Sequence, residues 1–309
     1  MSTTERTLSA PMPGPVVVDL TMPSGLIEVT VGDVDRAEIT LTSDAPTDSP
    51  AARAIAAATL SADARVVTVG VPTPEHDSVT VISGTRGGRI VVSGTTTSGI
   101  IVSGGTVHIS GTILSAGNHV AAVSSAALTP GVRVTVRLPR GCALRIDTRS
   151  AHVTTRGDLE WIDFVSVSGD LTAQACGKLT ASTSSGDVRA EFADGAVVRT
   201  ISGDIRLGRT ETAILSATSG DITIGDFGGS ARLRTVSGDI TVHATEPGQV
   251  SASATSGDIT VTAPADLAAG TGENALTVDA RSVTGDVRIP RPPSAPARPR
   301  RPRRGGSPL

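Results

Sequence analysis

Apolar and polar positions alternate along most of this chain, and in its second half the alternation follows a recurring corner. Each corner is followed by an apolar, a polar and a second apolar side chain, as in Ile205-Arg206-Leu207. Side chains of a strand point alternately to its two faces, so each run predicts a short strand with one buried row. Apolar or small residues also stand four and six places before each corner, which predicts a second strand in every unit.

The corner is the tripeptide Ser-Gly-Asp, replaced by Thr-Gly-Asp in the last copy. Its glycines lie 17, 17, 17, 18, 19 and 28 residues apart. Glycine suits a turn that needs a positive φ, and aspartate can accept backbone N–H groups a residue or two further on. The predicted turn residues are Gly169, Asp170, Gly186, Asp187, Gly203, Asp204, Gly220, Asp221, Gly238, Asp239, Gly257, Asp258, Gly285 and Asp286.

A period of this size is typical of a solenoid whose units stack on one another. The sequence therefore predicts an all-β fold, a β-helix or β-solenoid with about 17 to 19 residues per coil and roughly 4.8 Å between coils. A meander of antiparallel hairpins would show the same alternation. It gives no reason for the same corner to return at every second turn, so the pattern favours the β-helix.

The chain divides into a flexible lead, an N-terminal β region, the repeats and a tail. The expected boundaries are 1–14, 15–148 with a Gly/Ser-rich insertion at 79–117, 149–290 and 291–309. In the N-terminal region we expect strands at 16–20, 26–31, 37–41, 65–71 and 132–138. The Ala-rich stretch 49–59 is the one helix candidate, and 264–274 is expected to be an inserted loop.

Aromatic residues make up 1% of the chain, so the core must be aliphatic and thin. Trp161 and Phe164 are expected to pack near the start of the first full unit. Enzymes that act on polysaccharides need aromatic platforms for sugar rings, and this composition speaks against that class.

The formal net charge is −3, but six arginines in the tail leave about −9 for the remainder. The tail is rich in Pro, Arg and Gly, so we expect it to be disordered. It is a solubilising end, a non-specific contact to acidic lipid or nucleic acid, or a segment that docks on a partner through its prolines. The candidate anion-contacting residues are Arg298, Arg300, Arg301, Arg303 and Arg304.

The aspartates of the corners are the one constellation that suggests chemistry. Stacked carboxylates could hold a hard cation such as Ca²⁺, but each can equally cap its own turn, and the sequence favours the cap. Arg156-Gly157-Asp158 is interpreted as another Gly-Asp corner before Leu159 rather than an integrin motif. The five histidines, and Cys142 and Cys176, form no ligand or nucleophile motif. We predict no catalytic residue, no cofactor and no metal site.

A resemblance rests on Leu138-Pro139-Arg140-Gly141-Cys142-Ala143-Leu144, which follows an alternating strand and precedes the serial Gly-Asp corners. With the opening strands that end at Val31-Gly32-Asp33-Val34, it resembles a bacterial β-strand-repeat family of unknown function labelled "putative adhesin". The similarity covers roughly residues 15–290. It implies a β-solenoid with no established enzymatic activity.

The sequence thus predicts a non-enzymatic structural or interaction scaffold. Its partner is expected to be a protein or a second copy of the chain, because uncapped solenoid ends expose strand edges. The alternative is an adhesin-like surface or ligand-binding module, which would need export. The N-terminus shows no apolar h-region and no run approaches 18 apolar residues, so we expect a cytoplasmic protein.

Overall fold

The computed structural model describes residues 4–45, 49–63, 65–73, 131–269 and 275–290, together with the backbone of five short strands between 90 and 123. The large sheet contains β1 (Thr4–Ser9), β2 (Val17–Val31), β3 (Glu38–Ser43), β4 (Thr59–Asp63), β5 (Val66–Gly70), β11 (Arg133–Leu138), β12 (Ala143–Ser166), β13 (Leu171–Thr183), β14 (Val188–Thr200), β15 (Ile205–Ser216), β16 (Ile222–Ser237), β17 (Ile240–Ser256), β18 (Ile259–Thr262), β19 (Leu276–Thr284) and β20 (Val287–Arg288). The helices are α1 (Pro50–Ala57) and α2 (Ala265–Ala269).

Two smaller sheets contain the remaining five strands, of which four lie within the expected insertion 79–117 and the fifth, Ala121–Val123, follows it. They are β6 (Ile90–Val92), β7 (Ile100–Val102), β8 (Gly105–Ile109), β9 (Thr112–Ala116) and β10 (Ala121–Val123). The rest of 79–117, and the tail 291–309, lie outside the described residues. The expectations about order there stay predictions.

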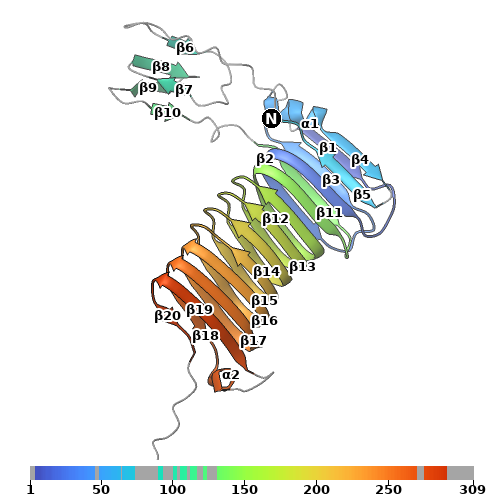
Figure 1. Ribbon diagram of the computed structural model, residues 1–309. Coiled ribbons are helices and arrows are strands. Elements are labelled where there is room, and N and C mark those ends of the chain that lie inside the picture. Colours follow the sequence, from blue (N-terminus) through green and yellow to red (C-terminus); the bar gives the residue numbers. More distant parts are fainter. Residues whose placement is uncertain are drawn as a thin grey trace, which may run out of the picture.

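Successive coils stack in parallel, as the rack of strands in Figure 1 shows. One column of the register runs Leu171, Val188, Ile205, Ile222, Ile240 and Ile259, one residue from each coil. The Gly-Asp corners therefore fall above one another. The predicted β-solenoid is confirmed, and an antiparallel meander of the repeats is ruled out.

The coils differ from the prediction in one respect, because each is a single bent strand rather than two short ones. β13 continues from Leu171 to Thr183 and pairs with β14 on both sides of the bend at Gly177. Extra residues in later coils appear as register shifts, for example between Thr210 and Thr212. Through β17 the chain leaves the ladder only at the Ser-Gly-Asp corner, and the opposite corner bends without losing its strand character. The last coil is the exception, because β18 and β19 are separate strands and the helix α2 lies between them, within the stretch 264–274 that was expected to be a loop.

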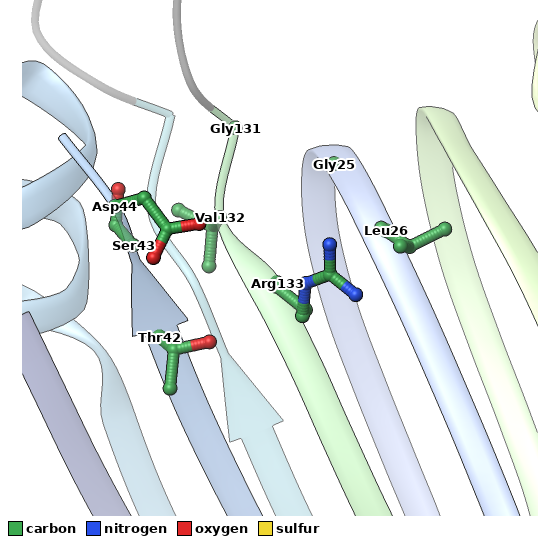
Figure 2. A pocket seen from close by; sticks show the side chains of 8 residues that line it. All are labelled: Gly25, Leu26, Thr42, Ser43, Asp44, Gly131, Val132 and Arg133. Carbon is green, nitrogen blue, oxygen red and sulfur yellow. The ribbon is translucent and has the colours of Figure 1, made fainter. Parts of the chain in front are cut away.

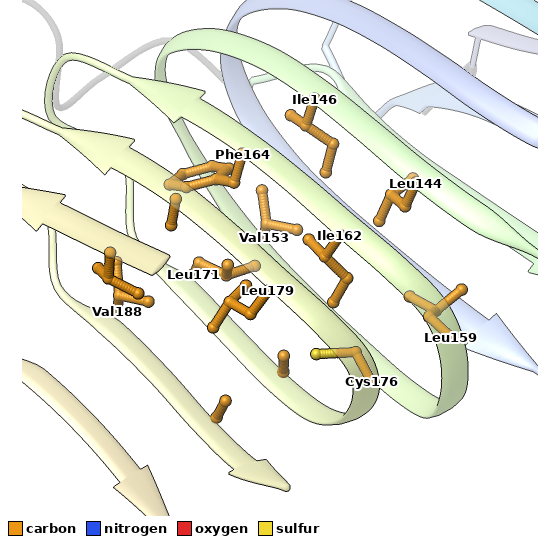
Figure 3. Close-up of a cluster of buried hydrophobic side chains, with 14 of the residues drawn as sticks. Leu144, Ile146, Val153, Leu159, Ile162, Phe164, Leu171, Cys176, Leu179 and Val188 are labelled. Carbon is orange, nitrogen blue, oxygen red and sulfur yellow. The ribbon is translucent and has the colours of Figure 1, made fainter. Parts of the chain in front are cut away.

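The core is a thin aliphatic layer between the first and second halves of the coils (Figure 3). Leu171 and Leu179, from the two halves of one coil, are both 0% exposed. Phe164 is fully buried at the start of the repeats, as expected, whereas Trp161 is partly exposed with the Arg145 guanidinium 5.8 Å from its ring centroid.

The solenoid begins before residue 149, because β12 pairs in parallel with β2 from Ala143 opposite Val17 to Arg156 opposite Thr30. β2 runs unbroken through the segment where a turn between two strands was predicted, and that prediction was wrong. The bend falls at Gly25, where φ is +135° and a Cβ atom would lie 2.1 Å from the carbonyl oxygen of Val132. The same coil architecture thus extends into the N-terminal region.

A cap closes the N-terminal end of the solenoid. β1 pairs antiparallel with β3, so the prediction of a flexible lead was wrong for Thr4–Ser9. The helix α1 falls within the predicted stretch 49–59, starts at the N-cap Ser49 and buries Ile55. Arg6 donates from Nη1 to the carbonyl oxygens of Ile55, Ala56 and Ala58, the last at 2.6 Å, and so satisfies carbonyls at the helix C-terminus.

Candidate interaction surfaces

The aspartates of the corners form a hydrogen-bonded column. Oδ1 of each accepts the backbone N–H of the aspartate one coil further on, at distances between 2.8 and 3.0 Å. The column contains Asp170, Asp187, Asp204, Asp221, Asp239, Asp258 and Asp286. The expected cap is therefore corrected: each carboxylate before the last caps the next coil rather than its own turn, because stacking brings the N–H of the next aspartate within hydrogen-bonding distance.

The second oxygen of these carboxylates, Oδ2, contacts a basic side chain in four of the coils. Asp187 and Asp204 contact Arg189 and Arg206 at 2.7 and 2.8 Å, and His152 lies 3.1 Å from Asp170. Arg288 approaches Asp286 at 3.3 Å in the last coil. Within the described ranges, the three carboxylates between have no cationic partner; these are Asp221, Asp239 and Asp258.

Asp187 shows how the ladder holds closely spaced carboxylates in their charged form. Burial by itself raises the pKa of Asp187. The N–H of Asp204 and the guanidinium groups of Arg189 and Arg206 outweigh burial, so the pKa of Asp187 lies below its ordinary value. The hydrogen bond to the next coil and the ion pair therefore give this carboxylate a structural role.

A cation held by this column was the alternative that the sequence did not favour, and it stays untested. The part of the chain that the structure describes contains no group of three or more His, Cys, Asp or Glu side chains arranged to hold a metal ion. The hydrogen bonds to the next coil already use one oxygen of each aspartate before the last.

The glycines of the corners are required by close approach rather than by a left-handed backbone. A Cβ atom on Gly203 would lie 1.9 Å from the carbonyl oxygen of Gly186 in the preceding coil. Of the seven corner glycines only Gly257 and Gly285 have positive φ, so the predicted reason was wrong for the other five. The hydroxyl oxygens of Thr183 and Thr200 accept hydrogen bonds from the backbone N–H groups of Gly186 and Gly203, at 3.0 and 2.9 Å.

The outer face of the second halves carries basic residues that lack acidic partners. One column alternates Ser182, Arg199, Ser216, Arg234, Ser253 and Arg281. Arg232 stands beside this column on the strand of Arg234. We call Arg199, Arg232 and Arg234 the arginine face; no ion pair joins any of them to an acidic residue in the described segments. The sequence analysis missed this group because the serines between them hide the period.

A pocket of about 350 Å³ lies where the cap meets the first coils (Figure 2). Its walls come from the bend of β2, the end of β3 and the start of β11, and its ionisable side chains are Asp44 and Arg133. Arg133 is also 3.4 Å from Glu28. The lining contains neither a nucleophile beside a base nor a pair of carboxylates.

The remaining candidate residues do not converge. Both thiols are buried: burial raises the pKa of Cys142, and burial with the carboxylates of Asp158 and Asp194 raises the pKa of Cys176 to about 12. His243 contacts Thr262 at 2.9 Å. His76 and His119 lie outside the described residues, as do the tail arginines, and for His108 only the backbone is described.

The Arg-Gly-Asp segment is a bend, although not at the expected corner. Gly157 lies within β12 on the side opposite the Ser-Gly-Asp corners, with φ of +90°. Its N–H donates to Oε1 of Gln174 at 2.8 Å. The glycine therefore serves the bend of its coil.

The C-terminal end of the solenoid is open. Within the described residues, β19 pairs only with β17, and β20 only with β18. Val287 and Ile289 are 40% and 46% exposed, while Ile259 and Val261, one coil earlier, are 0% and 2% exposed. The inner row of the last coil thus lacks the cover that every earlier coil receives.

No helix in the described segments has the length and apolar character needed to cross a membrane. This finding concerns helices alone.

The fold is similar to several solved structures at low sequence identity. A "putative adhesin" from Parabacteroides distasonis ATCC 8503 is 13% identical with a TM-score of 0.47, over 93% of this chain and 97% of that one. One from Bacteroides fragilis NCTC 9343 is 13% identical with a TM-score of 0.42, over 92% and 97%. A "putative lipid binding protein" from Parabacteroides distasonis ATCC 8503 is 12% identical with a TM-score of 0.49, over 93% and 97%.

No curated protein matches the chain. The family model described as Toastrack DUF4097 matches residues 18–300, which span the first coil, all the corners and the last coil. The resemblance noted from the opening strands and serial corners is thereby confirmed: the chain belongs to the Toastrack DUF4097 family.

Proposed function

We propose that this protein is a non-enzymatic scaffold that acts by association, and that its open C-terminal end is the site of self-association. The observation that carries the proposal is the asymmetry of the two ends. Within the described residues β1 and β4 at the N-terminal end are also edge strands with one partner each, but α1 packs against β1 and β3 and covers the core there. At the other end β19 and β20 each have one partner strand within the described residues.

The physical reason is the unpaired edge. A strand at a sheet edge presents N–H and C=O groups in a row and can pair with another strand. The apolar inner row behind it adds surface that association would remove from water. Because α1 covers the core at the other end, the expected product is a closed dimer rather than a filament, since an isologous contact uses the same patch on both copies.

Sedimentation velocity of the full chain across the micromolar range tests the proposal. We expect a concentration-dependent shift from monomer to dimer. Placing lysines on the outer side of the edge, as Thr277→Lys with Val283→Lys, should abolish the shift, because charged edge residues block strand pairing. A strictly monomeric wild-type chain would refute the proposal.

A second candidate is a ligand-binding module, and the arginine face is the observation that favours it. Unpaired arginines on a flat sheet suit a negatively charged partner surface. Co-sedimentation with phosphatidylserine vesicles tests this, with Arg199→Gln and Arg234→Gln combined as the variant and deletion of 291–309 as the separate test of the tail. Equal binding by both variants and the wild type would remove the candidate.

The scaffold proposal places the protein in the cytoplasm, whereas an adhesin-like role would require export. Cell fractionation separates the two. Recovery of the chain in the surface fraction would favour the adhesin-like role.

A further inference from the structure

Among the described residues one edge of β19 has no partner strand, and this edge carries a charge pattern that is complementary to itself. Asp279 and Arg281 both point to the outer face of the strand, 3.2 Å apart, with side chains 60% and 82% exposed. β19 runs from Leu276 to Thr284, so Ala280 is its midpoint and lies between the two charges. The charges along the strand are therefore complementary to those of a second copy that runs antiparallel to it.

We infer that two copies of this chain pair their β19 strands antiparallel about a twofold axis at Ala280. The inference rests on the proposed self-association and adds the register. With the axis normal to the sheet, outer side chains stay outer, so only registers that shift in steps of two residues are allowed. Centring on Ala280 places Asp279 directly opposite Arg281 of the second copy, twice.

The neighbouring allowed registers are worse for two separate reasons. Centring on Asp279 sets that carboxylate opposite its own copy, and centring on Arg281 does the same for the guanidinium. Opposite charges directly across an antiparallel pair stabilise it, and like charges destabilise it. The Ala280 register also overlaps the whole of β19, whereas each neighbour leaves residues at both ends without partners.

The inner side of the same register is compatible with a shared core. Val278 and Ala280 are partly buried against the core of the last coil. Their counterparts in β17, Val250 and Ala252, are 0% and 2% exposed because another coil covers them. A second copy would extend that cover, since it places Ala280 against Ala280 and Val278 near Ser282.

The chain's own tail is the alternative occupant of this edge. It leaves from β20, which pairs with β18, rather than from β19. Prolines recur at least every third or fourth residue from Pro290 to Pro302, and each lacks the N–H that a ladder needs. A second copy supplies a complete strand, so it is the better match.

Charge reversal tests the register in the full chain. Asp279→Arg and Arg281→Asp should each raise the dimer Kd at least about tenfold, because each sets two like pairs across the axis. Combining them restores opposite pairs and should return the Kd to within about threefold of wild type. The matched control is Arg234→Asp, in the same column but on β16, whose two neighbouring strands are in place; it should leave the Kd unchanged.

A disulfide cross-link gives a second measurement that does not depend on charge. Directly opposite residues of an antiparallel pair have Cα atoms about 4.5 to 5.5 Å apart, within disulfide range. Ala280→Cys should therefore form a covalent dimer under mild oxidation, while Ala252→Cys in β17 should not. The native thiols are buried, so the wild-type chain serves as the blank.

The outcomes separate the two claims. A wild-type dimer whose Kd ignores both single reversals, and in which Ala280→Cys does not cross-link, overturns the register and leaves self-association standing. A wild-type monomer overturns both. If deleting 291–309 turns a monomer into a dimer, the tail covers the edge and the inference is overturned as well.

Discussion

Oδ1 of Asp187 accepts a hydrogen bond from the backbone N–H of Asp204, 2.9 Å away and one coil further along the solenoid. The relationship has a direction, since every carboxylate in the column serves the coil that follows it. It also has an end: Asp286 accepts no such bond within the described residues, because no coil follows. The ladder thus explains how like charges can stack about 4.8 Å apart, and it marks the open end of the fold.

Removing a carboxylate from the middle of the column should cost stability. Asp204→Ala leaves the N–H of Asp221 without its acceptor and Arg206 without its partner. We expect a loss of about 1 to 3 kcal/mol in the free energy of unfolding, measured by urea denaturation. Asp204→Asn keeps an acceptor oxygen and should lose less.

The matched control is Asp286→Ala, since that carboxylate has no following coil to cap. It should change stability by no more than about 0.5 kcal/mol. Equal losses at the two positions would show that the ladder bonds do not matter.

Acid should weaken the fold through the same column. The folded pKa of Asp187 lies below its ordinary value of 3.8, so this group contributes stability that is fully present above the unfolded value. That contribution is lost as the pH falls from about 3.8 through the lower folded value. Melting temperatures measured from pH 6 to pH 2 should fall in this range, and Asp187→Asn should show a smaller fall.

Gly203→Ala should be among the most damaging single-methyl additions. Its Cβ atom would lie 1.9 Å from the carbonyl oxygen of Gly186, which is backbone and cannot rotate away. We expect a loss of about 3 kcal/mol, because the coils must separate to make room. Thermal and urea denaturation measure it.

Gly195→Ala is the control at the opposite corner. There the added atom would be 3.9 Å from the carbonyl oxygen of Gly177, an ordinary contact, and φ is not positive. The change in stability should stay within about 1 kcal/mol and can be favourable, because alanine restricts the unfolded chain. Similar damage from both substitutions would contradict the close-approach argument.

Thr241→Arg should add an ion pair that the earlier coils already have. Thr241 follows Asp239 by two residues in the column that holds Arg189 and Arg206. The new guanidinium should reach Asp239 as Arg206 reaches Asp204, and stabilise the protein by about 0.5 kcal/mol at low salt. Thr241→Gln tests length without charge, and a gain that survives 1 M NaCl would argue against pairing.

Neither cysteine thiol should react with a thiol reagent while the protein is folded. The pKa of Cys176 is raised to about 12, first by burial and then by Asp158 and Asp194. A thiol reagent at pH 8 should therefore label neither cysteine until denaturant is added. The raised value also means that stability is present below the unfolded value of 9.0 and is lost as pH rises toward about 12. Rapid labelling of the native chain would show that the coils open near Cys176.

Much of the fold could be predicted because the repeat encodes it locally. The alternation after each corner predicts which side chains are inside, and the 17-residue period between the first corners predicts that Leu171 and Val188 share a column. What failed were the ends of elements: Thr4–Ser9 forms a strand, since its partner β3 is distant in sequence. The sequence also did not predict that each strand continues through the bend. A Gly-containing link indicates a turn by its composition, and only pairing with a neighbouring strand keeps it in the ladder.

The sequence by itself determined the period, the buried rows and the family. The buried rows follow from the alternation within each coil, and the period and the family follow from motifs that recur along the chain. Only the tertiary structure decided which N–H each aspartate binds and why Gly203 must be glycine, because both depend on the adjacent coil, 17 residues away. It also decided that one end is closed and the other open. That difference comes from the packing of α1 on β1 and β3 at one end and, among the described residues, from the missing partner of β19 at the other, neither of which leaves a local pattern in the chain.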